Sequence, residues 1–184
     1  MLTFYVSLKN GEIDSYRISS TFDYNITRDY NIYNFSIEID QENFINFREA
    51  LSRFLEWESV AQNNNITEVF IREIPITVTS NNVTWSIRTD TGLHRFSNER
   101  PLIIRFNFLW DSVFTRGQLY IRSNTLNDGT PNYFLLEKRN MNREEIRFLF
   151  EGLSDDKIQE AIEQGRIRDL EREEQRQLID DLFN

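Results

Sequence analysis

The longest helical pattern in the chain runs from residue 40 to residue 63. Apolar residues recur there at spacings of three, four and seven, which places them along one side of a helix. They are Phe44, Phe47, Leu51, Phe54 and Ala61, with Ile45, Leu55, Trp57 and Val60 widening the stripe. Asp40 is placed to cap this helix, and Glu42 lies in the first turn, where the helix dipole favours negative charge. The pattern predicts a long amphipathic helix that covers a sheet.

Alternating apolar and polar residues predict antiparallel strands around this helix. Asn10-Gly11 is typical of a type I′ turn, so residues 2–19 are expected to form a hairpin. Further strands are predicted at residues 31–39, 66–74, 76–79, 83–89, 102–110, 117–123 and 132–138, with polar loops at 20–31 and 89–101. A short strand near Tyr24–Thr27 is an alternative within the first loop. Within residues 102–110, the stripe of Ile104, Phe106 and Phe108 is expected to face the helix.

From residue 140 the chain changes to helical patterns. Asn142 and Glu145 have the spacing of a capping box, which predicts a short helix. Ser154 opens a second helical pattern, and Gly165 is expected to stop it. A third helix is then predicted from Arg166 to the end of the chain.

These elements predict an α+β fold in which an antiparallel β-sheet of meanders and hairpins packs on one long amphipathic helix. The expected organisation is a β-rich domain, residues 1–139, with central helix 40–63, followed by an acidic helical segment, residues 140–184, with two short helices plus a terminal helix. A strand, a cap and a helix occur at Phe35–Leu55 and again at Phe134–Leu153, so an arrangement in two halves is an alternative.

Composition narrows the chemistry. The 184 residues include no Cys, which excludes disulfides, thiolate nucleophiles and Cys-ligated zinc. The first residues lack a basic start and a long apolar run, and no stretch is long and apolar enough for a membrane span. We therefore expect a cytoplasmic protein with no membrane association.

Catalytic patterns are weak. No phosphate loop, dinucleotide fingerprint or nucleophile elbow occurs. The single His, His94, lies in a predicted loop and is better interpreted as a solvated side chain than as a general base. Asp128 and the run Glu137-Lys138-Arg139 loosely resemble a metal-nuclease pattern, but the charge of Arg139 cannot be removed. We predict no cofactor and no metal, and a non-enzyme is favoured over an enzyme.

The middle of this acidic chain is basic. The net charge is −9 overall, but residues 84–139 carry 8 basic and 5 acidic residues, a net charge of +3. Arg88, Arg105 and Arg122 fall at outward positions of successive predicted strands, and Tyr120 lies near Arg122. A row of guanidinium groups and a ring on a sheet face suits single-stranded nucleic acid or an acidic protein patch. It is also found on ordinary solvated faces with cross-strand ion pairs.

The end of the chain offers a second candidate surface. Four apolar residues follow a charged run, EREEQRQ, at residues 171–177; we call them the terminal apolar cluster, and they are Leu178, Ile179, Leu182 and Phe183. A helix packed along its own domain would also need apolar residues within that run. The cluster is therefore expected to dock on its own fold, on a second copy or on another protein.

Two functions follow as hypotheses. The first is a non-catalytic protein-interaction module that binds, inhibits or scaffolds a protein partner, or forms a homo-oligomer, through the C-terminal helix. The alternative is a single-stranded DNA- or RNA-binding protein that uses the Arg and aromatic face of the sheet. The layout of strand runs each closed by a helix is similar to the Whirly and PUR arrangements of nucleic-acid-binding proteins, which implies the second function.

Overall fold

The computed structural model describes residues 2–27, 30–80, 82–89, 92–98, 102–114, 116–124 and 138–183. The chain divides into two compact units, Met1–Arg147 and Phe148–Asn184. The division falls within helix α2 (Arg143–Gly152), eight residues after the predicted boundary at residue 139.

The fold is α+β, with antiparallel sheets, a long helix and a C-terminal helix. The first sheet has the order β1-β2-β3-β5-β6, formed by Leu2–Lys9, Glu12–Thr27, Tyr30–Ile39, Asn82–Thr89 and Gly92–Asn98. The second sheet has the order β4-β7-β8-β9, formed by Phe70–Ser80, Leu102–Asp111, Arg116–Asn124 and Lys138–Met141. Short links join β1 to β2, β2 to β3, β5 to β6 and β7 to β8, and each of these pairs is antiparallel, so both sheets are largely meanders.

Helix α1 (Gln41–Asn63) forms where the sequence predicts it. The Asp40 carboxylate accepts a hydrogen bond from the backbone N–H of Asn43 at 2.9 Å, which satisfies one of the unpaired amides of the first turn. The turn at Asn10-Gly11 is also confirmed, because both residues have positive φ, 55° and 83°, as a type I′ turn requires.

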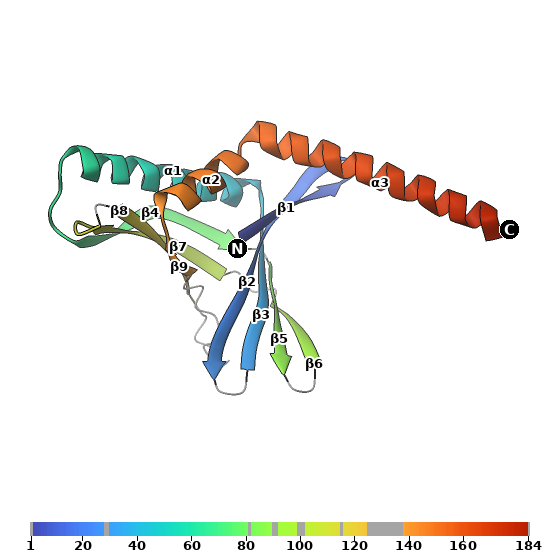
Figure 1. Ribbon diagram of the computed structural model, residues 1–184, viewed down its shortest axis with the longest axis horizontal. Coiled ribbons are helices and arrows are strands. Elements are labelled where there is room, and N and C mark those ends of the chain that lie inside the picture. Colours follow the sequence, from blue (N-terminus) through green and yellow to red (C-terminus); the bar gives the residue numbers. More distant parts are fainter. Residues whose placement is uncertain are drawn as a thin grey trace. The chain divides into compact units, whose positions relative to one another are not determined.

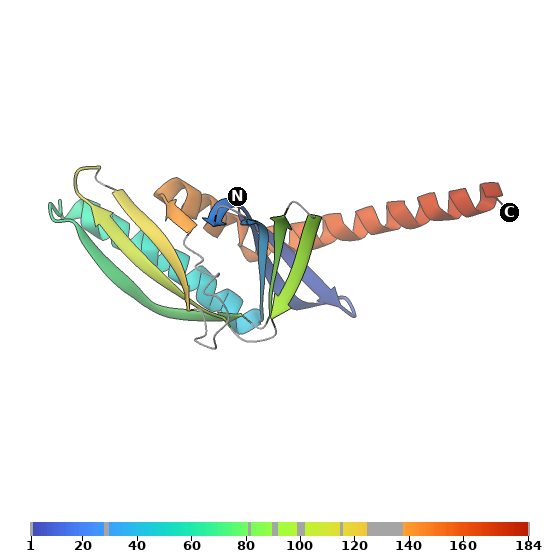
Figure 2. The ribbon, with the colours of Figure 1, turned by 90° about the horizontal axis from the view of Figure 1, so that it is seen from below.

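The main core lies between α1 and the sheets (Figures 1 and 2). Phe47 meets Phe106 at 5.6 Å between ring centroids, and Phe54 meets Phe108 at 5.4 Å, both edge to face. The first sheet contributes Tyr16 of β2 to this core, where its ring stacks on that of Phe44. The buried apolar side chains of α1 are Phe44, Phe47, Ala50, Leu51, Phe54 and Ala61, and those facing them from β7 are Ile104, Phe106, Phe108 and Trp110.

The buried stripe of α1 is narrower than predicted. Ile45 and Val60 are half exposed, because they flank the row that meets the sheets. Leu55 and Trp57 are partly buried at its margin.

Three strand predictions are wrong. β2 continues through residues 20–27, where a loop with at most a short strand near residues 24–27 was expected, because β3 pairs with it along that length. β6 occupies most of the second predicted loop and pairs with β5. β4 begins at Phe70, four residues later than predicted, and then continues through Pro75. Pro75 is tolerated because β4 is an edge strand and its register shifts between Ile74 and Thr77.

The capping box of α2 is confirmed in both directions. The Glu145 carboxylate accepts from the backbone N–H of Asn142, and the Asn142 side-chain oxygen accepts from the backbone N–H of Glu145, each at 3.0 Å.

The second unit is dominated by one helix. α3 runs from Asp155 to Phe183 without interruption, so the predicted stop at Gly165 and the separate terminal helix from Arg166 are wrong. A glycine inside a helix costs only about 1 kcal/mol relative to alanine, and good helix-forming residues on both sides offset that cost. Among the described residues of the second unit, the buried apolar side chains are Leu153, which precedes α3, and Ile158 and Ile162 of α3.

Candidate functional site

Local interactions of exposed side chains support α3. Lys157 pairs with Glu160, Arg166 with Glu163 at 3.6 Å, and Arg172 with Asp169 at 3.5 Å, all one turn apart. The hydrogen bond and the negative charge of Glu160 raise the pKa of Lys157 above its ordinary value. These contacts support the helix locally along its exposed surface.

The second half of α3 leaves large apolar side chains in solvent. After Ile162, no residue of α3 with a described side chain is buried, through residue 180. Leu170 is 60% exposed and Leu178 is 64% exposed, and Ile167 and Ile179 are about half exposed. Leu182 and Phe183 belong to the same helix, although their side chains lie beyond the described ones. The described part of the terminal apolar cluster is therefore exposed.

Three of these residues lie on one side of the helix. Ile167 and Leu178 are separated by about three full turns, and Leu170 lies one turn from Ile167. Glu171 and Glu174 fall within the same sector, between the two apolar ends. This side, which we call the α3 face, combines Ile167, Leu170 and Leu178 with two carboxylates. Over its whole length α3 carries 10 acidic and 5 basic residues, a net charge of −5.

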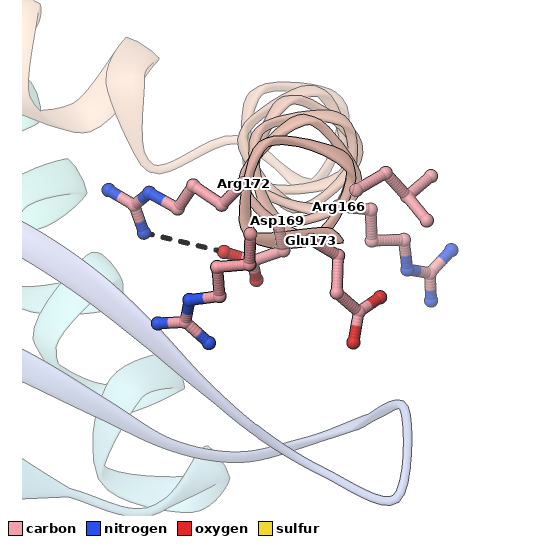
Figure 3. A pocket seen from close by; sticks show the side chains of 6 residues that line it. Arg166, Asp169, Arg172 and Glu173 are labelled. Atoms are coloured by element: carbon pink, nitrogen blue, oxygen red, sulfur yellow. Dashed lines mark hydrogen bonds and ion pairs between the residues drawn. The ribbon is translucent and has the colours of Figure 1, made fainter. Parts of the chain in front are cut away.

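A second strip of α3 is almost entirely charged (Figure 3). Arg166, Asp169, Arg172, Glu173 and Arg176 line this strip together with Leu170. All of these side chains come from one helix, and Arg172 and Asp169 point toward one another in their ion pair (Figure 3). The strip is an open surface on one helix.

Part of the predicted arginine row comes together on the second sheet. Arg105 of β7 and Arg122 of β8 are Cα partners, and Tyr120 is the partner of Asn107. Residues directly opposite each other in an antiparallel ladder share one face. Only the backbone places Tyr120 and Arg122, since their side chains are outside the described set.

Arg88 does not belong to this row. It lies on β5 of the first sheet, opposite Asn31 and Leu93, whereas Arg105 lies in the second sheet. The predicted row across successive strands is split because β6 follows β5 in the first sheet and β7 joins β4 instead. Arg105 also forms an exposed ion pair with Glu73 at 3.8 Å, the cross-strand pairing expected of an ordinary solvated face.

A buried ionic network, which the sequence does not predict, lies on the inner side of α1. Glu58 of α1 is 1% exposed, and its carboxylate accepts hydrogen bonds from Arg143 at 2.8 Å and from the backbone N–H of Gly117 at 3.0 Å. Arg143 also donates to the hydroxyl of Ser59 at 3.3 Å. The network ties α1 to β8 and to the start of α2, and we interpret it as structural because both oxygens are used within the fold.

A signal for Glu58 was present in the pattern. It lies four residues after Phe54 and seven after Leu51, so it occupies the buried stripe of α1. A carboxylate at such a position requires a buried partner, but the sequence does not indicate which arginine supplies it.

The weaker chemical candidates gain nothing from the structure. His94 lies on β6 opposite Ile87, and its side chain is not among those described; Asp128 and Glu137 fall in residues 125–137, which the described ranges omit. Within the described residues, no three acidic or His side chains group to hold a metal ion. Among the described helices, none combines the length and apolar composition that crossing a membrane requires.

Comparisons with protein-family models, with curated proteins and with solved structures found no match.

Proposed function

We propose that this protein is a non-catalytic protein-interaction module whose helix α3 docks in an apolar groove on another protein. The observation that carries the proposal is the exposure of Leu170 and Leu178 on one side of a helix that buries no described side chain after Ile162. Exposed apolar residues repeated along a helix are the anchors by which helices bind grooves.

Charge on the α3 face indicates the kind of partner. Glu171 and Glu174 lie between Leu170 and Leu178. A groove that binds both leucines would therefore place side chains of the partner close to the two carboxylates. Lys or Arg side chains at those places would pair with them. A second α3 would instead oppose carboxylates with carboxylates, so a basic foreign partner is favoured over a helix-mediated homo-oligomer. The Cys-free composition supports a cytoplasmic location for this binding.

The test begins with capture from source-cell lysate by the full-length chain, followed by purification of the captured protein. Binding of that protein is then measured by calorimetry at two salt concentrations. The double variant Leu170→Ser/Leu178→Ser should lose binding, and wild-type affinity should fall as salt rises.

The matched control is Val113→Ser, which removes an apolar side chain that is 80% exposed in the β7–β8 turn. It should bind as the wild type does. Unchanged binding by the double variant would exclude the α3 face as the docking surface.

A second candidate function is single-stranded nucleic acid binding by the second sheet. The specific observation is that Arg105 and Arg122 are Cα partners, which brings two basic residues to one face of the sheet, where Glu73 offsets Arg105 only through an exposed ion pair at 3.8 Å. Fluorescence anisotropy with a mixed single-stranded oligonucleotide would test it. Binding that weakens with salt and with Arg105→Ala, but not with Arg53→Ala on α1, supports it; a flat titration excludes it.

A further inference from the structure

Strand β4 forms one edge of the second sheet. Among the described strands it pairs only with β7, so alternate residues direct backbone N–H and C=O groups away from the sheet. Pro75 and the register shift between Ile74 and Thr77 disrupt the second half of this edge. The first half, Phe70–Ile74, has no such interruption.

Apolar side chains accompany this edge. Ile71 of β4 is 62% exposed, and Val69, which directly precedes the strand, is 60% exposed. A strand extended back past Phe70 places the two on one face, because they are two residues apart. An edge with exposed apolar residues favours pairing with another strand. Neither position carries a charged side chain, which would oppose pairing of this edge with another strand.

We propose that β4 pairs antiparallel with β4 of a second copy of this chain, with Phe70 opposite Phe70. In this register Glu68 lies opposite Arg72 of the second copy, and Val69 lies opposite Ile71 of the second copy. The two-fold symmetry repeats both pairs, so the contact has two ion pairs and two apolar pairs around one aromatic pair. The second sheets of the two copies then form one continuous sheet.

Other registers centred on a residue of β4 fit less well. A centre at Arg72 places two arginines opposite each other, and a centre at Glu73 does the same with two glutamates. A centre at Ile71 places Val69 opposite Glu73. Like charges directly opposite are destabilising, so charge complementarity selects the register centred on Phe70.

The surroundings of Arg72 fit this role. Its guanidinium lies over the Trp57 ring, 5.2 Å from the centroid, which fixes the side chain at the edge of the sheet. The donors of a guanidinium lie in its plane, so stacking on a ring leaves them available to a carboxylate. β4 begins at Phe70, and the pairing extends the strand back by two residues to include Glu68.

A charge exchange tests the register. Arg72→Glu and Glu68→Arg each place like charges opposite each other, and each should convert a dimer to a monomer in sedimentation velocity. The combined variant Glu68→Arg/Arg72→Glu restores both pairs and should restore the dimer. Arg53→Glu, an exposed change on α1, is the control that should leave the dimer intact.

Circular dichroism of each variant separates loss of the dimer from loss of the fold. A wild-type chain that stays monomeric at micromolar concentrations and above would overturn the proposal. So would a combined variant that stays as monomeric as the two single variants, because repulsion between the copies would then not explain the loss.

Cysteine pairing gives an independent measurement, since the natural chain has no Cys. Chains with Val69→Cys and chains with Ile71→Cys are mixed and oxidised. Directly opposite residues have Cβ atoms about 4.5–5.5 Å apart, near the separation a disulfide needs. The mixed disulfide should therefore dominate, whereas dominance of the Ile71→Cys homodimer would overturn the register.

The variant Leu170→Ser/Leu178→Ser should still dimerise; its failure would assign the contact to α3 instead.

Discussion

The two long helices of this protein are opposites in how they are stabilised. α1 has 23 residues and buries seven of them, with a row of aromatic rings against the sheets. α3 has 29 residues and buries only Ile158 and Ile162 among its described side chains. Both are continuous helices, so helical conformation alone does not distinguish a core element from an exposed one.

The difference lies in the spacing of apolar residues. In α1 they recur every three or four residues, and tertiary packing stabilises the helix. In α3 charged pairs one turn apart take their place, and the apolar residues are too far apart to cover a surface continuously. We infer that substitutions in α1 alter folding, whereas substitutions in the second half of α3 alter binding.

The sharpest test of this difference compares two truncations. Phe54→Ala removes a buried ring that packs on Phe108, and it should lower the free energy of unfolding by about 3–5 kcal/mol. Leu170→Ala removes an exposed side chain and should change it by less than about 0.5 kcal/mol. Urea unfolding monitored by circular dichroism at 222 nm measures both, because all three Trp residues lie in the first unit and their fluorescence would not report on α3. Equal losses would show that α3 has a buried face after all.

The next effect concerns the ionic network of α1. Arg143→Leu leaves the Glu58 carboxylate buried without its cation, and the expected loss in unfolding free energy is about 3 kcal/mol. Glu58→Gln keeps an acceptor for the amide of Gly117 and should cost less.

A double-variant cycle of Glu58→Gln and Arg143→Leu isolates the pair. The combined loss should be smaller than the sum of the single losses, because Glu58→Gln removes the charge that Arg143→Leu leaves unpaired. Additive losses would contradict a direct interaction between the two side chains.

A third test concerns the close approach of α1 to β8. A Cβ atom at Gly117 would lie 2.6 Å from a ring carbon of Phe108 and 3.2 Å from side-chain atoms of Glu58 and Phe54. Gly117→Ala should therefore lower the unfolding free energy by about 1–3 kcal/mol through overpacking. Gly152→Ala, where no atom lies within 4 Å, is the matched control for adding a methyl group. A neutral Gly117→Ala would mean that Phe108 moves aside at little cost.

The sequence predicts well where local chemistry determines the structure. The Asp40 cap, the Asn10-Gly11 turn and the capping box of Asn142 and Glu145 are all confirmed, because each depends on a few neighbouring residues. The face of β7 that meets α1 is also confirmed. Its large apolar side chains, Ile104, Phe106 and Phe108, recur at every second residue without a break.

Predictions fail where distant partners decide. Residues 20–27 are polar enough for a loop, yet β3 holds them in a strand. Arg88 and Arg105 have similar patterns, and only the sheet order separates them. Glu58 lies on a recognisable stripe, but its pairing with Arg143 joins residues far apart in the sequence. Among the candidate surfaces, the exposure of the described part of α3 could be predicted because it follows from composition within one helix.

The smallest expected effect tests the continuity of α3 at Gly165. No atom lies within 4 Å of a Cβ built there, and Gly165 is not in a positive-φ conformation. Gly165→Ala should therefore stabilise the helix by about 0.5–1 kcal/mol, because alanine loses less conformational freedom on entering a helix. Amide hydrogen exchange should slow in the turns on either side of residue 165 while the amides of α1 keep their rates. If Gly165 instead ended one helix in a left-handed conformation, alanine would be strained there and the same amides would exchange faster. The direction of the change thus distinguishes one long exposed helix from two short ones.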